Sequence, residues 1–152
     1  MRQFSKNKPK FQDISPEINY EEIKQYWKKG KELNPALFSE LANKWAQIIS
    51  ERGKKEKRRK NKPSQLRKFY DEILRVYYDY KANNNFELAK VKLHKIIAFI
   101  YYADGRELIT RGVTYLFENL IKDIENSEDF KIAVSFLEAF MGFYKYYRPG
   151  EN

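Results

Sequence analysis

Apolar residues recur every three or four positions along most of this chain. That spacing places them on one face of an α-helix, and no segment alternates apolar and polar residues as a half-buried strand does. Helices are predicted over 15–30, 34–53, 63–82, the stretch between turns at 83–85 and 104–105, 109–124, and 127–148. The sequence therefore predicts an all-α fold, a single-domain helical bundle of about five to six helices.

Local signals mark where several of these helices begin and end. Ser15 precedes Pro16 as a cap and first helical residue, and Ser127 precedes two acidic residues that favour a helix N-terminus. Gly53 is expected to end the second helix. The helix that ends at 104–105 is apolar on more than one face, which predicts burial at the centre of the bundle.

Charge is distributed unevenly along the chain. Residues 1–62 hold 17 Lys/Arg and 8 Asp/Glu, a net of +9, whereas residues 63–152 hold 13 of each. We therefore expect a basic flexible arm at 1–14 and a single helical domain at 15–152. That domain would comprise a helical pair at 15–53, a basic loop at 54–62 and a core bundle at 63–152.

The basic loop at 54–62 indicates that the protein binds an anionic partner. Like charges packed this densely repel one another, and an anionic polymer would neutralise them. Nucleic acid is the first candidate, and a solvated spacer in a Lys/Glu-rich protein is the alternative. The residues expected to contact RNA phosphate are Lys54, Lys55, Lys57, Arg58, Arg59, Lys60, Lys62, Arg67 and Lys68, followed by Arg106, Arg111, Lys145 and Arg148.

Catalytic chemistry is poorly represented. The chain has no cysteine and a single histidine, His94, without a phosphate-cradling glycine loop or a metal-ligand spacing. No enzymatic activity, cofactor or metal is therefore expected. Glu138 lies in an apolar run, and a buried carboxylate needs a partner, so Arg67 and Arg106 are its candidate ion-pair partners. Either arginine could instead face RNA phosphate.

Five tyrosines fit no single apolar stripe. They could stack on unpaired bases or pack against a neighbouring subunit, and subunit packing is slightly favoured. They are Tyr78, Tyr101, Tyr102, Tyr146 and Tyr147.

Three motifs in order resemble the small helical subunit of type III-A (Csm) CRISPR effector complexes. Residues 64–70 read Ser-Gln-Leu-Arg-Lys-Phe-Tyr, like that family's Ser/Thr-Gln-Ile/Leu-Arg-Lys-Phe-Tyr opening. Residues 102–106 resemble its Tyr-Ala-Ala-Gly-Arg turn but depart at Asp104. Residues 136–146 resemble its terminal Phe-Phe-Glu-Ala-Ile-Val-Ala-Tyr-His-Lys-Tyr segment, with Tyr144 where histidine is common. The match covers 62–148, and residues 1–61 carry none of these motifs.

The resemblance implies a cytoplasmic, non-catalytic subunit present in several copies. Its partners would be guide RNA and target RNA, the large signalling subunit, the backbone subunits and further copies of itself, with no membrane. A homodimer of the isolated chain remains open. The subunit would contact the RNA backbone without reading its sequence. In RNA-guided systems, base pairing between guide and target reads the sequence. A purely structural protein–protein adaptor and, third, an RNA-processing nuclease acting through Glu138 are the alternatives.

Overall fold

The computed structural model describes residues 19–29, 32–56 and 59–150. In these residues the chain forms six α-helices and one short 3₁₀ helix, and it forms no strand. In chain order they are α1 (Glu21–Trp27), η3 (Pro35–Phe38), α2 (Glu40–Lys55), α3 (Pro63–Asn83), α4 (Phe86–Gly105), α5 (Arg111–Lys122) and α6 (Ser127–Tyr147). The predicted all-α bundle is confirmed.

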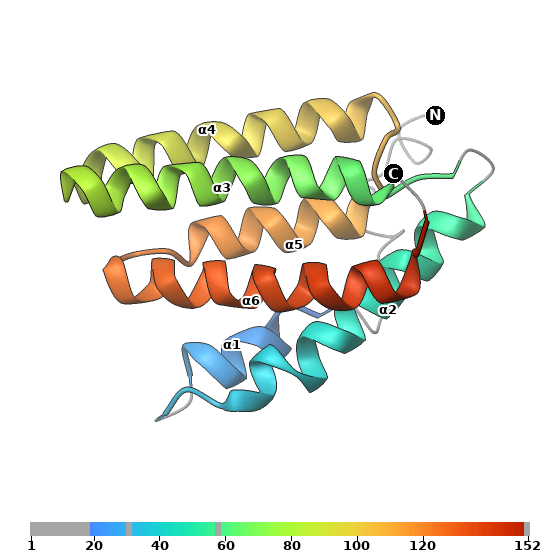
Figure 1. The fold of residues 1–152 in the computed structure, drawn as a ribbon, viewed down its shortest axis with the longest axis horizontal. Helices are drawn as coiled ribbons and strands as arrows, with labels where there is room; N and C mark the ends of the chain where they lie inside the picture. The colour runs from blue at the N-terminus through green and yellow to red at the C-terminus, as the bar shows by residue number, and fades with distance from the viewer. Residues whose placement is uncertain (1–18, 30–31, 57–58, 151–152) are drawn as a thin grey trace, which may run out of the picture.

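The helices pack in layers around one apolar core. Figure 1 shows α3 and α4 side by side along one edge, α5 and α6 beneath them, and α1 and α2 at the opposite edge. Fully buried side chains from different helices, such as Trp45 of α2, Phe69 of α3 and Phe117 of α5, belong to the same cluster. Helix α2 makes its most extensive contacts with α6, so it forms part of this core.

Helix α6, and not α4, occupies the centre of the bundle. It lies between α2 and α3, and its Phe130, Phe136 and Phe140 have no exposed surface. The prediction of a central α4 was wrong, because only one of its two apolar faces is buried. Leu93 and Ile100 face the core, whereas Leu88, Val91 and Tyr102 remain exposed.

Asparagine side chains set several helix boundaries. At the predicted turn after α3, Asn84 adopts a left-handed conformation with φ 57°, and the Asn85 side chain caps α4 by accepting from Leu88 N–H at 3.1 Å. Asn126 caps α6 in the same way, accepting from Asp129 N–H at 2.8 Å. The cap therefore lies one residue before the predicted Ser127.

The first helix is held against α6 by one buried carboxylate. Asp129 accepts from the Trp27 indole at 3.3 Å and from the Lys28 ammonium at 2.6 Å. Burial opposes the charge on Lys28, but hydrogen bonds to Asp129 and Glu125 outweigh it, and the pKa of the Lys28 amine is raised. Helix α1 is shorter than the predicted helix at 15–30, because residues 19–20 and 28–29 are not helical. Ser15, Gly30 and the predicted arm at 1–14 lie outside the described residues.

Gly53 serves a different purpose from the one predicted. Helix α2 continues past it to Lys55, and Gly53 is buried where the returning chain crosses the helix. A Cβ at Gly53 would lie 2.4 Å from the backbone oxygen of Lys60 and 2.9 Å from Cβ of Asn61. Glycine is therefore required here for close approach of two backbone segments, and it does not end the helix.

This crossing gives a matched pair of substitutions. We expect Gly53→Ala to destabilise the protein by about 1–3 kcal/mol, because backbone must move to accommodate the methyl group. Gly142→Ala, at an exposed position of α6 where a Cβ would meet nothing within 4 Å, should stabilise it by about 0.5–1 kcal/mol. Urea unfolding followed by tryptophan fluorescence measures both. Equal effects would contradict the close-approach explanation.

Candidate nucleic-acid interface

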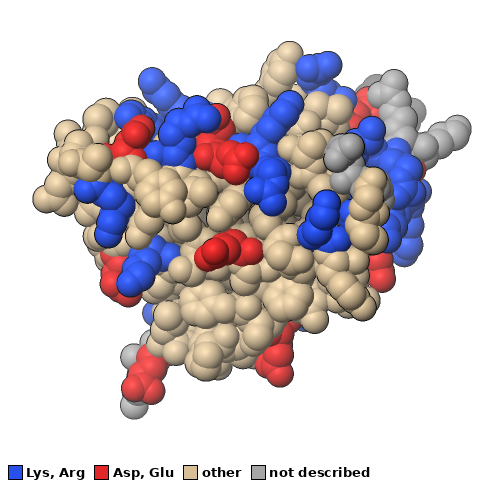
Figure 2. All heavy atoms as spheres, in the orientation of Figure 1, with Lys and Arg blue, Asp and Glu red and all other residues tan. Residues whose placement is uncertain are grey.

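One end of the bundle gathers the C-terminal ends of α2 and α6, the start of α3 and the turn between α4 and α5. Figure 2 shows Lys and Arg concentrated on this end of the molecule, at the right of the view. We call it the basic end, and define it by the exposed or half-buried Lys54, Lys55, Arg59, Lys60, Lys62, Arg67, Lys68 and Lys145. Lys57 and Arg58, also predicted as RNA contacts, lie outside the described residues.

The segment between α2 and α3 is fixed at Asn61. This residue has no exposed surface and a φ of 59°, a conformation that asparagine tolerates better than most side chains. Its backbone N–H donates to the Leu108 carbonyl at 3.0 Å. Its side chain accepts from Thr110 N–H at 2.8 Å and donates to the Ile49 carbonyl at 3.0 Å. One residue thus joins the segment to α2 and to the α4–α5 turn.

The same point binds the end of α6. The Asn61 carbonyl accepts from the Tyr144 hydroxyl and from the Arg148 guanidinium, the latter at 3.3 Å. Arg148 also donates to the Lys60 carbonyl at 3.2 Å, and it has no exposed surface. Arg148 was therefore wrong as a surface contact, because its guanidinium satisfies buried carbonyls at the chain crossing.

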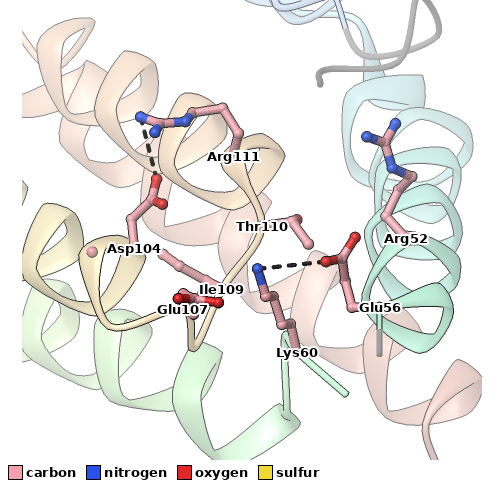
Figure 3. A pocket seen from close by; sticks show the side chains of 9 residues that line it. Arg52, Glu56, Lys60, Asp104, Glu107, Ile109, Thr110 and Arg111 are labelled. Atoms are coloured by element: carbon pink, nitrogen blue, oxygen red, sulfur yellow. Dashed lines mark ion pairs between the residues drawn. The ribbon is translucent and has the colours of Figure 1, made fainter. Parts of the chain in front are cut away.

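Beside this crossing lies a polar pocket of about 480 Å³, shown in Figure 3. It separates α2 from the α4–α5 turn. Three basic and three acidic side chains line it: Arg111, Asp104 and Glu107 on one side, and Arg52, Glu56 and Lys60 on the other. The pocket is therefore close to neutral.

Four of the six charged side chains that line the pocket form two ion pairs with each other. Arg111 lies 3.3 Å from Asp104, and Lys60 lies 3.5 Å from Glu56. The Asp104 carboxylate also accepts from Thr114 at 2.7 Å. Asp104, at which the resemblance departs from its pattern, thus holds Arg111 largely away from solvent. Arg111 is 17% exposed, so it is a poor candidate for phosphate contact.

The predicted ion pair of Glu138 is absent. Glu138 is exposed on α6, and among the described residues neither arginine pairs with it. Arg67 lies 4.0 Å from Asp71, one turn along α3, and Arg106 lies 5.7 Å from the Tyr102 ring centre. The apolar neighbours of Glu138 in the sequence wrongly predicted its burial. Leu137 and Phe140 point into the core, whereas Glu138 lies on the solvent-facing side of α6.

The ambiguous tyrosines differ in their environments. Tyr78, Tyr102 and Tyr146 are exposed by 62%, 63% and 76%. Tyr101 donates to Glu118 at 2.6 Å, and Tyr147 is half-buried and donates to Asn43.

Three further observations on the described residues concern catalysis, metal binding and membrane insertion. His94 is exposed on α4. No group of three or more His, Cys, Asp or Glu residues in the described ranges could hold a metal ion. Within the same ranges, no helix combines the length and apolar composition needed to cross a bilayer.

Two functional features were missed in the sequence. Arg52 lines the pocket from α2, and Asn61 organises the whole basic end. Asparagine inside a Lys-rich run directly before Lys62-Pro63 was a usable signal, because asparagine is enriched at left-handed backbone positions in turns.

A small helical protein with a cationic end is the class that these features define. The family model described as Csm2 Type III-A matches residues 39–150, and the chain belongs to this family. It is therefore a subunit of the type III-A CRISPR complex, which confirms the resemblance. No curated protein and no solved structure matches this chain.

The family match reaches further than the three motifs. It begins at residue 39 and so includes α2, which carried no recognisable motif. Helix α2 packs on α6 and supplies core residues such as Trp45 and Ile49, so the matched range includes the whole packed core from α2 to α6.

The Asn61 junction can be tested with two substitutions. Asn61→Gly keeps the left-handed backbone accessible but removes the side-chain bonds, and we expect a loss of about 2–3 kcal/mol in unfolding free energy. Asn61→Ala should cost about 1 kcal/mol more, because alanine is strained at this φ. Urea unfolding measures the difference. Identical stability of the two variants would contradict a left-handed backbone at this position.

Proposed function

We propose that the chain binds guide and target RNA in its complex through backbone phosphates, without reading sequence and without catalysing a reaction. The observation that carries this proposal is the basic end. Among its described residues, Lys55, Lys62, Lys68 and Lys145 form no ion pair within 4.0 Å and are exposed. Cations that no protein carboxylate neutralises are available to phosphates.

The kind of cation favours backbone contact over base readout. Lysine is a flexible point charge, whereas base recognition in grooves relies on bidentate groups held in fixed geometry. Phosphate contacts position a protein on RNA but carry no sequence information. Sequence would then be read by pairing between guide and target.

Arg67 and Lys68 support the same proposal from the start of α3. They follow directly on the segment pinned at Asn61, and both are exposed. Arg106 is exposed beyond α4, and we include it as a peripheral contact together with Lys145. Arg148 is excluded from the proposed surface by its burial, and Arg111 by its pairing with Asp104.

Further partners of the chain are part of the proposal. The complex would bring it against backbone subunits, the large signalling subunit and other copies of itself, in the cytoplasm. Exposed Tyr102 and Tyr146 support such protein contacts.

Salt dependence tests the electrostatic contribution. If about five phosphates are neutralised, log K for single-stranded RNA should fall with log salt at a slope near −3.5. Filter binding or anisotropy across a range of potassium chloride concentrations gives the slope. A flat dependence would sink the phosphate mechanism.

Substitution at the basic end tests its location. Replacing Lys55, Arg59 and Lys62 with alanine should weaken binding to unrelated RNAs about equally and reduce the magnitude of the salt slope by about 2. The matched control replaces the exposed Lys81, Lys122 and Lys131 with alanine. These lysines lie toward the opposite end of the bundle, and their substitution removes the same formal charge. The control should leave the slope nearly unchanged.

The outcomes of this pair separate the proposal from its alternatives. Equal weakening by both triple variants would mean that net charge alone attracts RNA. Loss of assembly with RNA binding unchanged would favour the structural adaptor. Metal-dependent RNA cleavage by the pure protein, abolished by Glu138→Gln, would establish a nuclease. Substitution is preferable to deleting 54–61, because deletion would also remove Asn61 and its contacts to Ile49 and Thr110.

A further inference from the structure

Helix α4 carries a second apolar stripe that the bundle leaves uncovered. Among the described residues, nine large hydrophobic side chains are exposed, and five of them belong to α4. The exposed positions that form the stripe are Leu88, Val91, Lys95, Ala98 and Tyr102. Their spacing of three, four, three and four residues is that of a coiled-coil seam. The seam is about 21 Å long at 1.5 Å per residue.

A groove runs beside this stripe. It has a volume of about 520 Å³ and lies between α3 and α4, with Val76, Ile96 and Phe99 in its lining. Phe99 is 42% exposed and, with Lys95, borders both the groove and the stripe. The ridge and the groove together form a continuous surface. Soluble monomers seldom leave an extended apolar surface uncovered unless it binds something.

The charge on the outward face of α4 itself has one sign, whereas the neighbouring groove also contains Glu72 and Asp79 of α3. From Leu88 to Ala103, α4 contains Lys90, Lys92 and Lys95 but no Asp or Glu. Lys92 is neutralised by Asp79 of α3, at 3.6 Å. Within the described residues, Lys95 has no carboxylate within 4.0 Å, although it lies at the middle of the apolar stripe. An occupant of the stripe would leave Lys95 buried and unpaired unless it supplied an acid.

We propose that the outward face of α4 binds an acidic amphipathic helix of another subunit of the complex. The partner would lay an apolar seam along Leu88, Val91 and Tyr102 and place a carboxylate opposite Lys95. In such helix-on-helix recognition, apolar side chains spaced three and four residues apart supply the contact, and flanking charges select the partner. The inference rests on the subunit contacts included in the proposed function, and it is independent of RNA binding.

A second copy of this chain is a poor occupant of the same face. Lys95 is the central residue of the five-residue seam. A parallel two-fold pairing of α4 with α4, or an antiparallel one that overlaps the whole seam, would therefore bring the two Lys95 ammonium groups together. Like charges in contact at an interface centre are destabilising. RNA also fits less well, because three of the five stripe positions, Leu88, Val91 and Ala98, are aliphatic and Tyr102 is the one stripe residue with a ring on which a base could stack.

The test uses the full chain co-expressed with the other subunits of the type III-A complex. We expect the double variant Val91→Glu, Ala98→Glu to lower the amount of this chain in the purified complex at least tenfold, because two carboxylates enter an apolar seam facing an acidic partner. The control Leu33→Glu changes an exposed apolar residue between α1 and η3, outside the stripe, and should leave the amount unchanged. Circular dichroism melting establishes that each variant remains folded.

Contact with a carboxylate is tested directly at Lys95. Carbodiimide treatment of the wild-type complex condenses a lysine amine with a nearby carboxylate, and mass spectrometry identifies the joined peptides. We expect Lys95 linked to Asp or Glu in a helix of a different subunit. No link from Lys95, a link to another copy of this chain, or equal loss of the Leu33→Glu control would each overturn the inference.

The RNA affinity of the isolated variants separates this inference from the proposed function. Val91→Glu, Ala98→Glu should retain wild-type affinity and salt slope while being lost from the complex. Retained assembly with weakened RNA binding would overturn the α4 inference while supporting an RNA contact on α4.

Discussion

A single backbone crossing governs how this molecule presents its charge. At Asn61 the chain returns from α2 toward α3, adopts a left-handed conformation in the protein interior, and bonds to Ile49, Thr110 and Tyr144. The crossing is close enough to require glycine at position 53. Three segments distant in sequence therefore converge on one asparagine, and the cations on either side of it are held at the same end of the bundle.

The burial of Arg148 at this crossing shows that a basic side chain near a cationic surface can serve the packing of the protein and be absent from that surface. A terminal arginine in a basic protein is easily taken for a surface contact, yet its guanidinium donates to the carbonyls of Lys60 and Asn61. Those carbonyls belong to a loop without regular partners, and a buried carbonyl without a donor is costly. Arg148 therefore satisfies buried carbonyl groups and adds no exposed charge to the basic end.

The sequence predicted the positions of the helices well, but it predicted poorly which side chains are buried, exposed or paired. Helix identity followed from spacing, and the break at Asn84 and Asn85 falls within the predicted turn at 83–85, because asparagine tolerates left-handed backbone angles, whereas Asn83 is the last residue of α3. The central position of α4, the ion pair of Glu138 and the exposure of Arg148 were wrong. Each depended on which face of a helix meets which neighbour, and a one-dimensional pattern contains no such information. Gly53 was ambiguous for a related reason, since helix ends and close approaches both favour glycine.

The position of α4 at an edge of the bundle, away from the core, has a thermodynamic consequence. Its exposed face and the basic end are made of different residues, although the ring centre of Tyr102, at one end of the stripe, lies 5.7 Å from the guanidinium of Arg106. A chain held on its complex through α4 would meet RNA at a high effective concentration, set by geometry and independent of its abundance in the cell. Individually weak phosphate contacts would then suffice, and a subunit of this kind could release RNA quickly without leaving the assembly.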